Sequence, residues 1–162
     1  MKHIEYIKEI AAMAQSKGHP LPQWLKFDTS PWTEMQKPLA VTRLALLTSG
    51  GISSKDQEPF NPRAVNDLSF REISTDTPYE KLILHSDAYD HRDALQDLNC
   101  VYPVKRLLEL EESGFIGGLC QYAFTLGMGR LDKVEELQKE TVPKIVKKMK
   151  KYQAGAVLLL AL

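Results

Sequence analysis

The stretch Gly155-Ala156-Val157-Leu158-Leu159-Leu160-Ala161-Leu162 is an apolar run without a polar side chain. A run of this length that follows a glycine is typical of a strand buried on both faces of a parallel sheet. In open α/β sheets, ligands bind just beyond the carboxyl ends of such strands. Chain termini usually lie at the surface and fray, so this run predicts either a segment held by a partner or a truncated product.

The composition of the 162 residues indicates a single domain that can bury a core of its own. Lys and Arg together number 21, as do Asp and Glu, so charge gives no argument for binding nucleic acid or an anionic membrane. Cys100 and Cys120 are too few and too far apart for a disulfide framework or a C-x-x-C pair. The segment Met1–Ile10 is charged and helical in pattern, unlike a signal peptide, and we expect a cytoplasmic protein.

Residues 1–38 differ in character from the rest of the chain. Their first apolar residues recur at helical spacing, and Gly18 is typical of a helix end. The stretch that follows contains several prolines together with Trp24 and Trp32. We expect an N-terminal helix and a Pro/Trp-rich arm over residues 1–38, whose aromatic side chains pack elsewhere, and an α/β domain over residues 39–162.

Several apolar runs in the second part of the chain have the length of strands. Arg43–Thr48 predicts a strand that ends in the tight turn Ser49-Gly50-Gly51. The polar, proline-containing stretch Ser53–Asp67 predicts a long loop. Further strands are predicted near residues 69–73, 81–85, 116–129 and 155–162.

Helical patterns separate these strands. One helix is predicted from Pro103 to Gly114. A second covers Leu131–Tyr152, where Pro143 either breaks the helix or begins a new one with Thr141 as its N-cap. The alternation predicts an α/β fold with a mainly parallel sheet, Rossmann-like and doubly wound in three layers, and forming the N-terminal portion of a larger domain.

The turn Thr48-Ser49-Gly50-Gly51 is the first candidate site. Backbone N–H groups in a turn after a buried strand can hold an anion. The pattern is not G-x-G-x-x-G, and no helix clearly follows it. A tight turn without a ligand is the alternative interpretation.

The stretch His85–Asp93 is unusually rich in histidine and aspartate. Imidazole and carboxylate groups suit zinc or iron, and the run is weakly similar to the H-x-H-x-D-H motif of metallo-β-lactamase-like hydrolases. Asp87 stands where that motif has a histidine, and His3 and His19 lie in the N-terminal arm, so further ligands are missing. The alternative is an Asp-rich loop of turns and caps.

Cys100 precedes the helix predicted to begin at Pro103. A thiol at a helix N-terminus is favoured as the reactive thiolate. A lone cysteine is also commonly a small buried hydrophobe, and both interpretations stay open for Cys100. Cys120 lies inside an apolar run, which favours a core position.

Taken in order, short elements from Pro31 onward carry a resemblance to a known family. They are Pro31-Trp32-Thr33; Leu44–Ile52; Ser69–Ile73; His85 with Tyr89-Asp90; Asp97–Pro103; Arg106-Leu107 and Glu109-Leu110; Gly114–Gly117; and Gly155–Leu159. Each element alone is weak, but their order and spacing together are specific. The chain resembles the selenoprotein B family of the glycine, sarcosine, betaine and D-proline reductases, and the D-proline reductase selenocysteine subunit in particular.

The resemblance implies reductive cleavage of a C–N bond of D-proline, glycine, sarcosine, betaine or a related compound, with dithiols as electron donors. It also implies a selenocysteine, and a partner subunit that carries a pyruvoyl group. The family spacing places the selenocysteine immediately after Leu162. We therefore expect that the chain ends at an in-frame UGA codon, and that without the selenium it has no reductase activity.

Candidate site residues follow from this placement at the carboxyl ends of strands. The amides of Gly50 and Gly51 are expected to hold a substrate carboxylate that Arg71 pairs with, and histidine or aspartate to donate a proton. The substrate-binding candidates are Thr48, Ser49, Gly50, Gly51, Arg71 and Asn99, and the catalytic candidates are His85, Asp90, His91 and Cys100.

Two other classes of function remain open. One is a non-catalytic, Rossmann-like scaffold of the same family that binds a partner or a small molecule, and the other is a metal-dependent hydrolase. A sheet edge left open by truncation also predicts self-association through Val157–Leu162 or through the arm around Trp24 and Trp32.

Overall fold

The structure is a computed structural model that describes residues 5–18, 21, 27–61, 67–85, 91–127 and 134–161. The chain divides into two compact units, Met1–Glu34 and Met35–Leu162. The first contains helix α1, Tyr6–Ser16, which ends before Gly18 in the left-handed conformation, so the helix predicted there is confirmed. Trp24 lies outside the described residues, and the packing expected of the arm's aromatic side chains stays a prediction.

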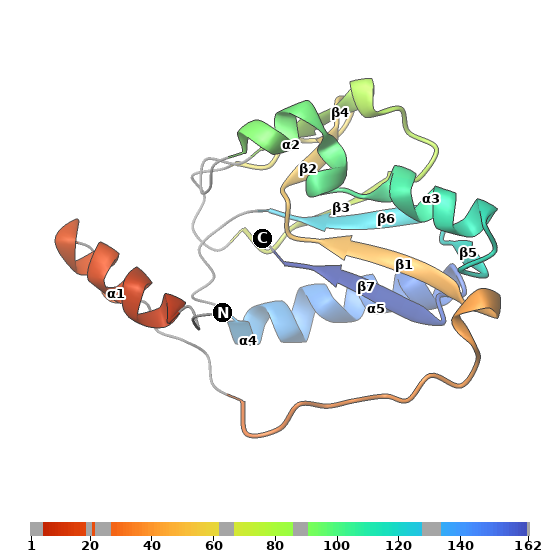
Figure 1. Ribbon diagram of the computed structural model, residues 1–162, viewed down its shortest axis with the longest axis horizontal. Coiled ribbons are helices and arrows are strands. Elements are labelled where there is room, and N and C mark those ends of the chain that lie inside the picture. Colours follow the sequence, from red (N-terminus) through yellow and green to blue (C-terminus); the bar gives the residue numbers. More distant parts are fainter. Residues whose placement is uncertain are drawn as a thin grey trace. The chain divides into compact units, whose positions relative to one another are not determined.

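The second unit is built around strand β1, Arg43–Thr48 (Figure 1). On one side β1 pairs in parallel with β7, Ala156–Leu160. On the other side it pairs in parallel with β5, Gly118–Leu119, and then with β6, Tyr122–Leu126. The outer neighbour of β6 is β3, Phe70–Ser74, which runs antiparallel. The predicted α/β fold with a mostly parallel sheet is therefore confirmed, with one antiparallel strand at the edge.

A separate antiparallel ribbon is formed by β2, Ile52–Ser54, and β4, Leu82–Leu84. The prediction of a loop from Ser53 onward was wrong at its start, because Ser53 and Ser54 pair with Ile83 and Leu82. Two serines give no strand pattern on their own, and β2 becomes a strand only because β4 lies beside it.

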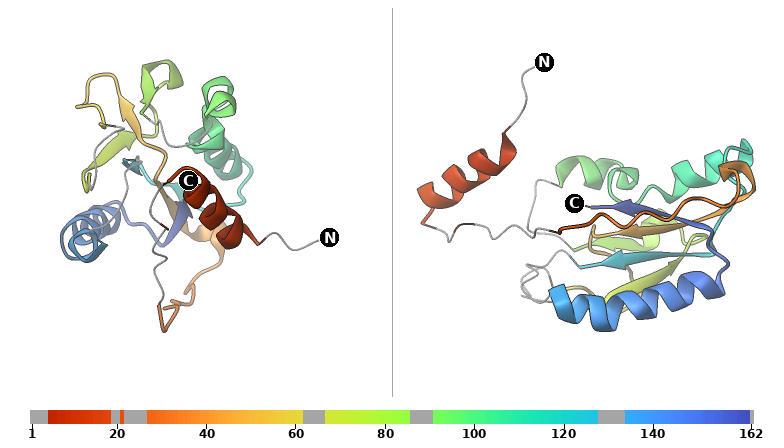
Figure 2. Two further views of the ribbon diagram at one scale, coloured as in Figure 1. Left: turned by 90° about the vertical axis from the view of Figure 1, so that its left-hand side faces the viewer. Right: turned by 90° about the horizontal axis from the view of Figure 1, so that it is seen from below.

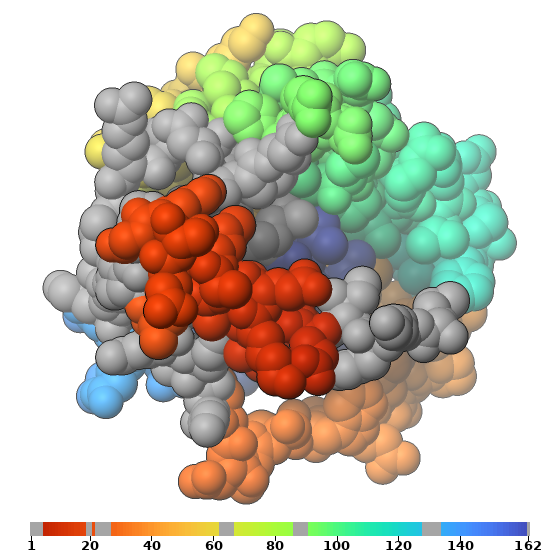
Figure 3. Space-filling view, turned by 60° about the vertical axis from the view of Figure 1, so that its left-hand side comes forward, coloured from red at the N-terminus to blue at the C-terminus, as the bar shows by residue number. Residues whose placement is uncertain are grey.

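Helices and the ribbon cover the sheet on its two faces (Figures 1 and 2). The β2–β4 ribbon, α2 (Arg92–Gln96) and α3 (Val104–Glu112) lie on one face, and α5 (Val142–Lys151) lies on the other. Figure 3 shows the ribbon in yellow to light green next to α2 in green. Short 3₁₀ helices span Leu39–Val41, Tyr79–Lys81 and Leu98–Cys100.

Alternate residues of β1 enter two different cores, as the two-residue period of a strand requires. Leu46 packs with Ile52, Tyr102 and Val104 under the ribbon and α3. Ala45 packs into the other cluster, which forms against α5. The members of that second cluster are Ala45, Cys120, Phe124, Ile145 and Met149, so the predicted core position of Cys120 is confirmed.

The helix that precedes β7 runs through its proline without a break. It consists of α4 (Val134–Glu136), a π-helical turn (Leu137–Thr141) and α5, with Pro143 in the first turn of α5. Thr141 occupies the N-cap position, but its hydroxyl donates to the carbonyl of Leu68 at 2.7 Å and does not cap the helix. Similarly, α3 begins at Val104 with Pro103 at the N-cap position, one residue later than predicted.

Glu72 on β3 joins the sheet to α5. Its carboxylate accepts hydrogen bonds from the ammonium group of Lys148 and from the hydroxyl of Tyr152. The hydrogen bond to Glu72 is the main cause that raises the pKa of Tyr152 to about 12. These contacts fix which flank of α5 faces β3.

The prediction that β7 is buried on both faces was wrong. The exposed fractions are 43% for Val157, 37% for Leu158 and 69% for Leu159. Within the described ranges β7 pairs with β1 alone. Apolar composition indicates that a strand is suited to burial, but it does not say which segment covers it.

Candidate functional site

The carboxyl ends of β1, β6 and β7 meet at the turn Ser49–Gly51. The Ser49 amide donates to the carbonyl of Leu160 at 3.0 Å, and the Gly51 amide donates to the carbonyl of Leu126 at 2.9 Å. Gly51 has a positive φ of 66°, a conformation that glycine adopts without strain. The turn that the sequence singled out therefore lies where ligands bind in open α/β sheets.

Thr48 connects this turn to the segment around Cys100. Its side chain is fully buried, and its hydroxyl donates to the carbonyl of Val101 at 2.9 Å. The same oxygen accepts the amide of Gly50 at 3.1 Å. The residue after Cys100 is thus held against the end of β1.

Each amide of the turn already has an acceptor within the protein. The amides of Ser49 and Gly51 bind strand carbonyls, and the amide of Gly50 binds the Thr48 hydroxyl. These donors hold the edge of the sheet together, so a substrate carboxylate could reach the amides of Gly50 and Gly51 only by displacing those bonds.

His85 is hydrogen-bonded to the turn. Its backbone N–H donates to the carbonyl of Gly51 at 2.9 Å, and its ring Nε2 lies 2.8 Å from the hydroxyl oxygen of Ser53. Ser53 is buried, so this contact fixes the orientation of the ring. Burial and, secondarily, the positive charge of Arg71 lower the pKa of His85 below its ordinary value.

Arg71 and His85 both contact the aromatic ring of Phe60. The guanidinium carbon lies 4.1 Å from the centroid of the Phe60 ring, and that ring meets the His85 ring edge-on with centroids 6.3 Å apart. The Nε of Arg71 donates to the carbonyl of Glu58 at 2.7 Å. Arg71 therefore holds the 58–60 segment against His85 and brings a positive charge to this edge of the sheet.

Asn99 and Cys100 form part of a 3₁₀ turn. The amide and the Nδ2 of Asn99 donate to the carboxylate of Asp97 at 3.0 and 2.8 Å, and the Tyr79 hydroxyl lies 2.8 Å from Asn99 Oδ1. Cys100 is exposed, which rules out the buried interpretation of its side chain. It does not lie in the first turn of α3, because three residues separate it from Val104.

The other catalytic candidates, Asp90 and His91, belong to the segment that follows β4. His91 occupies the N-cap position of α2. Asp90 lies outside the described residues. Among the described residues, no three His, Cys, Asp or Glu side chains form a group that could hold a metal ion. The run His85–Asp93 that suggested a metal site is described only in part, because residues 86–90 are not included.

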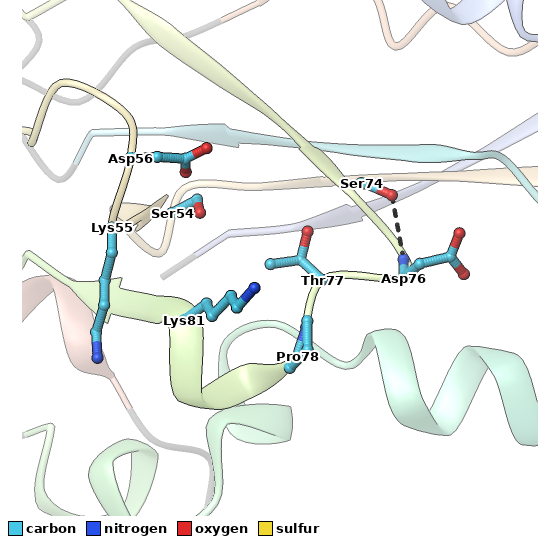
Figure 4. Close-up of a pocket in the computed structure, with 8 residues that line it drawn as sticks. All are labelled: Ser54, Lys55, Asp56, Ser74, Asp76, Thr77, Pro78 and Lys81. Carbon is cyan, nitrogen blue, oxygen red and sulfur yellow. Dashed lines mark hydrogen bonds between the residues drawn. The ribbon is translucent and has the colours of Figure 1, made fainter.

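Two cavities lie outside this group. One, of about 370 Å³, lies at the end of β3 opposite to the turn, and in it Lys81 points toward Thr77 (Figure 4). None of the candidate residues line it; the lining is Ser54, Lys55, Asp56, Ser74, Asp76, Thr77, Pro78 and Lys81. The other, of about 350 Å³, lies beside β4 and α2 and has Asn99 and Tyr79 in its wall.

Sequence reasoning missed Ser53, Phe60 and Tyr79. Ser53 was assigned to a loop, and nothing in its neighbourhood pointed to a histidine partner. Phe60 is the single aromatic residue of the polar stretch Ser53–Asp67, which is a signal that something packs on it. The group formed by the turn, His85, Ser53, Phe60 and Arg71 is called the strand-end cluster below.

The fold and the cluster define an α/β protein with polar groups at the carboxyl ends of parallel strands. The model of the glycine/sarcosine/betaine reductase selenoprotein B family matches residues 7–161. The chain belongs to this family, which confirms the resemblance drawn from its sequence elements. Within the described residues, no helix is both long and apolar enough to cross a bilayer.

Two curated proteins illustrate the relationship. The chain is 33% identical over 132 residues to D-proline reductase subunit gamma of Acetoanaerobium sticklandii, which covers 80% of this chain and 52% of that protein. It is 30% identical over 168 residues to glycine reductase complex component B subunit gamma of Symbiobacterium thermophilum, covering 94% of this chain and 35% of that protein. The matched region is therefore about half or less of each relative. No solved structure matches the chain.

Proposed function

We propose that this chain is the N-terminal part of a selenoprotein B-type reductase subunit, which cleaves a C–N bond of D-proline, glycine, sarcosine, betaine or a related compound. The family match over residues 7–161, with the strand-end cluster at the carboxyl edge of the sheet, carries this proposal. The relatives' names mention D-proline and glycine, both of which have a carboxylate next to the C–N bond.

Arg71 is the group proposed to attract the substrate carboxylate. It is the charged residue of the cluster, and it stacks on Phe60 beside His85. Ser49, Gly50 and Gly51, held in place by the buried Thr48, form the rigid edge beside which the substrate binds, and Asn99 lines the neighbouring cavity. The turn amides already donate to acceptors of the protein. The substrate therefore contacts side chains and leaves these hydrogen bonds in place.

His85 is the proposed proton carrier of the reaction. A leaving amine needs a proton when the C–N bond breaks. The lowered pKa keeps His85 neutral in the free protein, and an anionic substrate nearby favours its protonated form. Asp90 and His91 are kept as further candidates, and the exposed thiol of Cys100 is proposed to take part in the redox cycle.

Selenocysteine is the group that the family implies for this chemistry. The Ser49 amide binds the carbonyl of Leu160, so the segment that leaves β7 starts at the strand-end cluster, which fits a selenolate placed after β7. A selenolate at this place would supply the nucleophile, its oxidation together with a thiol to a selenium–sulfur bond would supply the two electrons, and a dithiol would reduce that bond again. The residues of this chain bind the substrate, orient it and exchange its proton.

Partner subunits belong to the proposal as well. The relatives are named as subunits of larger reductases, which supports assembly with other polypeptides. We propose a pyruvoyl-containing subunit as the partner, a homo-oligomeric arrangement of this chain, and a cytoplasmic location.

A non-catalytic scaffold is the second candidate, and one observation favours it. The turn amides bind the protein's own acceptors, and Arg71 already donates to Glu58 and Ser69. A protein that only binds a partner would need no free donors at this edge. A metal-dependent hydrolase is the third possibility, and metal analysis of the purified protein tests it.

Reconstitution with the pyruvoyl-containing subunit tests the proposed function. We expect dithiol-dependent consumption of at least one of D-proline, glycine, sarcosine and betaine by the natural gene product. His85→Gln should lower kcat by about 100-fold or more, since general acid catalysis contributes on that scale. Glu135→Gln, on the exposed side of α4, serves as the control.

Two outcomes would contradict the reductase proposal. A complex that forms without turnover of the four compounds favours the scaffold. A gene that lacks an in-frame UGA after the codon for Leu162, or lacks an open frame beyond it, removes the selenocysteine part.

A further inference from the structure

The larger of the two cavities described above, of about 370 Å³, differs in character from the strand-end cluster. It is formed by the turn that follows β2, the turn that follows β3, and the 3₁₀ helix Tyr79–Lys81. Its lining contains two lysines, two aspartates, hydroxyl groups and a proline ring, and its volume lies in the range of sites for small molecules. None of these residues belongs to the strand-end cluster, so the larger cavity is a separate feature of the molecule.

Hydrogen bonds hold the walls of the larger cavity in place. The Lys55 amide donates to the carbonyl of Lys81 at 2.8 Å and joins the two strands of the ribbon. In the turn after β3, the Thr77 amide donates to the carbonyl of Ser74 at 3.0 Å, and the Asp76 amide donates to the Ser74 hydroxyl at 3.3 Å (Figure 4). Walls that are fixed before a ligand enters lower the entropic cost of binding it.

The four charged side chains of the lining do not all face the same space (Figure 4). The carboxylate of Asp56 and the ammonium group of Lys81 lie on the sides of the space between the ribbon and Thr77. The side chains of Lys55 and Asp76 extend away from it. The larger cavity therefore presents one cation and one anion to a ligand.

Asp56 and Lys81 are near each other without forming an ion pair. A hydrogen bond from Ser54 is the main cause that lowers the pKa of Asp56, and the charge of Lys81 adds to the effect. The ion pairs found within the described part of the chain include neither residue. A simple anion or cation in this space meets one favourable and one unfavourable charge, whereas a molecule with both charges can bridge the two side chains.

We propose that the larger cavity is a second binding site, which takes a small zwitterion with a carboxylate and an ammonium group, as in an α-amino acid. The ligand's carboxylate binds the ammonium group of Lys81 and the hydroxyl of Thr77, and its ammonium group binds the carboxylate of Asp56. The apolar part of the ligand lies against the ring of Pro78. The site is at the end of β3 away from Arg71, and it does not depend on the reductase chemistry.

Nuclear magnetic resonance of the ¹⁵N-labelled chain tests this site, because it follows each amide separately. Glycine is the probe, as the smallest α-amino acid. The amides of residues 54–56, 74–77 and 81 should shift along one saturable curve, with an affinity of about 1 mM for so small a probe. Shifts of residues 49–51 and 85 report on the strand-end cluster, so the outcome for this site and the outcome for the proposed function are distinguished.

Two probes with a single charge test the zwitterion preference on the unaltered chain. Acetate carries only the carboxylate, and methylammonium carries only the cationic group. Each should bind at least tenfold more weakly than glycine, because each lacks one of the two charge-assisted hydrogen bonds.

Substitutions within the lining test the roles of the two charges. Lys81→Met and Asp56→Asn remove a charge with little change in size, and each should raise the dissociation constant for glycine at least tenfold. Lys55→Met and Asp76→Asn are the matched controls, since these side chains belong to the same lining but point away (Figure 4). They should change the dissociation constant by less than about threefold, because exposed charges at a distance are screened.

Three results would overturn the proposal. They are the absence of saturable shifts at the residues of the lining, binding of acetate or methylammonium as tight as that of glycine, and equal loss of affinity in Lys55→Met and Lys81→Met. The first two use the unaltered chain, so they decide the proposal even where a variant does not fold.

Discussion

His85 shows how a single residue acquires its environment from distant segments. Its place in a polar run after a strand marked it as a candidate, and the structure locates it at the strand-end cluster. The partners that define its chemistry, Ser53 and Phe60, come from the earlier stretch between β1 and β3. The spacing of residues within the run His85–Asp93 could not predict these partners, because the contacts arise only when the β2–β4 ribbon forms.

The lowered pKa of His85 leads to a prediction about stability. Below its ordinary pKa of 6.5 the unfolded chain takes up a proton that the folded protein resists. The contribution of His85 to the unfolding free energy should therefore be complete above pH 6.5. It should decrease as the pH falls below 6.5. His85→Gln, which keeps a polar group near Ser53, should make this dependence shallower in urea denaturation between pH 5 and 8.

His91→Gln is the control for that experiment, because His91 lies at the start of α2 and not against Ser53. An unchanged slope in His85→Gln would contradict the assignment of the pH dependence to His85.

At the scale of elements, prediction succeeded where a segment carries its own signal. β1, β3, β4, α1 and α3 were predicted from apolar runs and helical spacing, and each lies within a few residues of its predicted place. β2 was missed because its residues are polar and its strand character comes from β4. The burial of β7 was predicted wrongly, because the composition of a strand does not say which segment packs against it.

Gly117 gives a prediction at the same scale. A Cβ at this position would lie 2.4 Å from the carbonyl carbon of Val41 and 2.5 Å from the amide nitrogen of Thr42. These are backbone atoms that cannot move without disturbing the start of β1. Gly117→Ala should therefore lower the unfolding free energy by about 3 kcal/mol, toward the upper end of the cost of overpacking.

The matched control is Gly114→Ala. Gly114 has a φ of 72°, but a Cβ there would meet nothing within 4 Å. The cost should be about 1 kcal/mol from the left-handed conformation alone. Equal destabilisation of the two variants in chemical denaturation would show that the contact with Val41 does not matter.

At the scale of the whole molecule, the family was predictable from ordered short elements, and the family match confirms it. The arrangement of the site was less accessible. The sequence identified the turn at the end of β1, but hydrogen bonds between the turn and the ends of β6 and β7 depend on strand order, which composition does not encode.

Charge balance leads to a prediction for the molecule as a whole. The isoelectric point is near 6.9, and proteins associate most readily where their net charge vanishes. Solubility should have its minimum close to pH 6.9, measured by polyethylene glycol precipitation. Leu159→Lys should raise the solubility at that pH more than Leu95→Lys, because it places a charge among the exposed apolar side chains of β7, Val157, Leu158 and Leu159. An equal increase in solubility for Leu159→Lys and Leu95→Lys would show that the increase comes from net charge only.

The pairing of β1 with β7 also bears on how the protein is made. β1 is the first strand of the sheet along the chain, and β7 is the last element described. After β1 leaves the ribosome, all the elements between β1 and β7 must be synthesised before β7 emerges. Long-range parallel pairings of this kind form slowly and leave apolar segments open in the meantime. Newly synthesised copies should therefore depend on chaperones that hold β1 until translation passes Leu160.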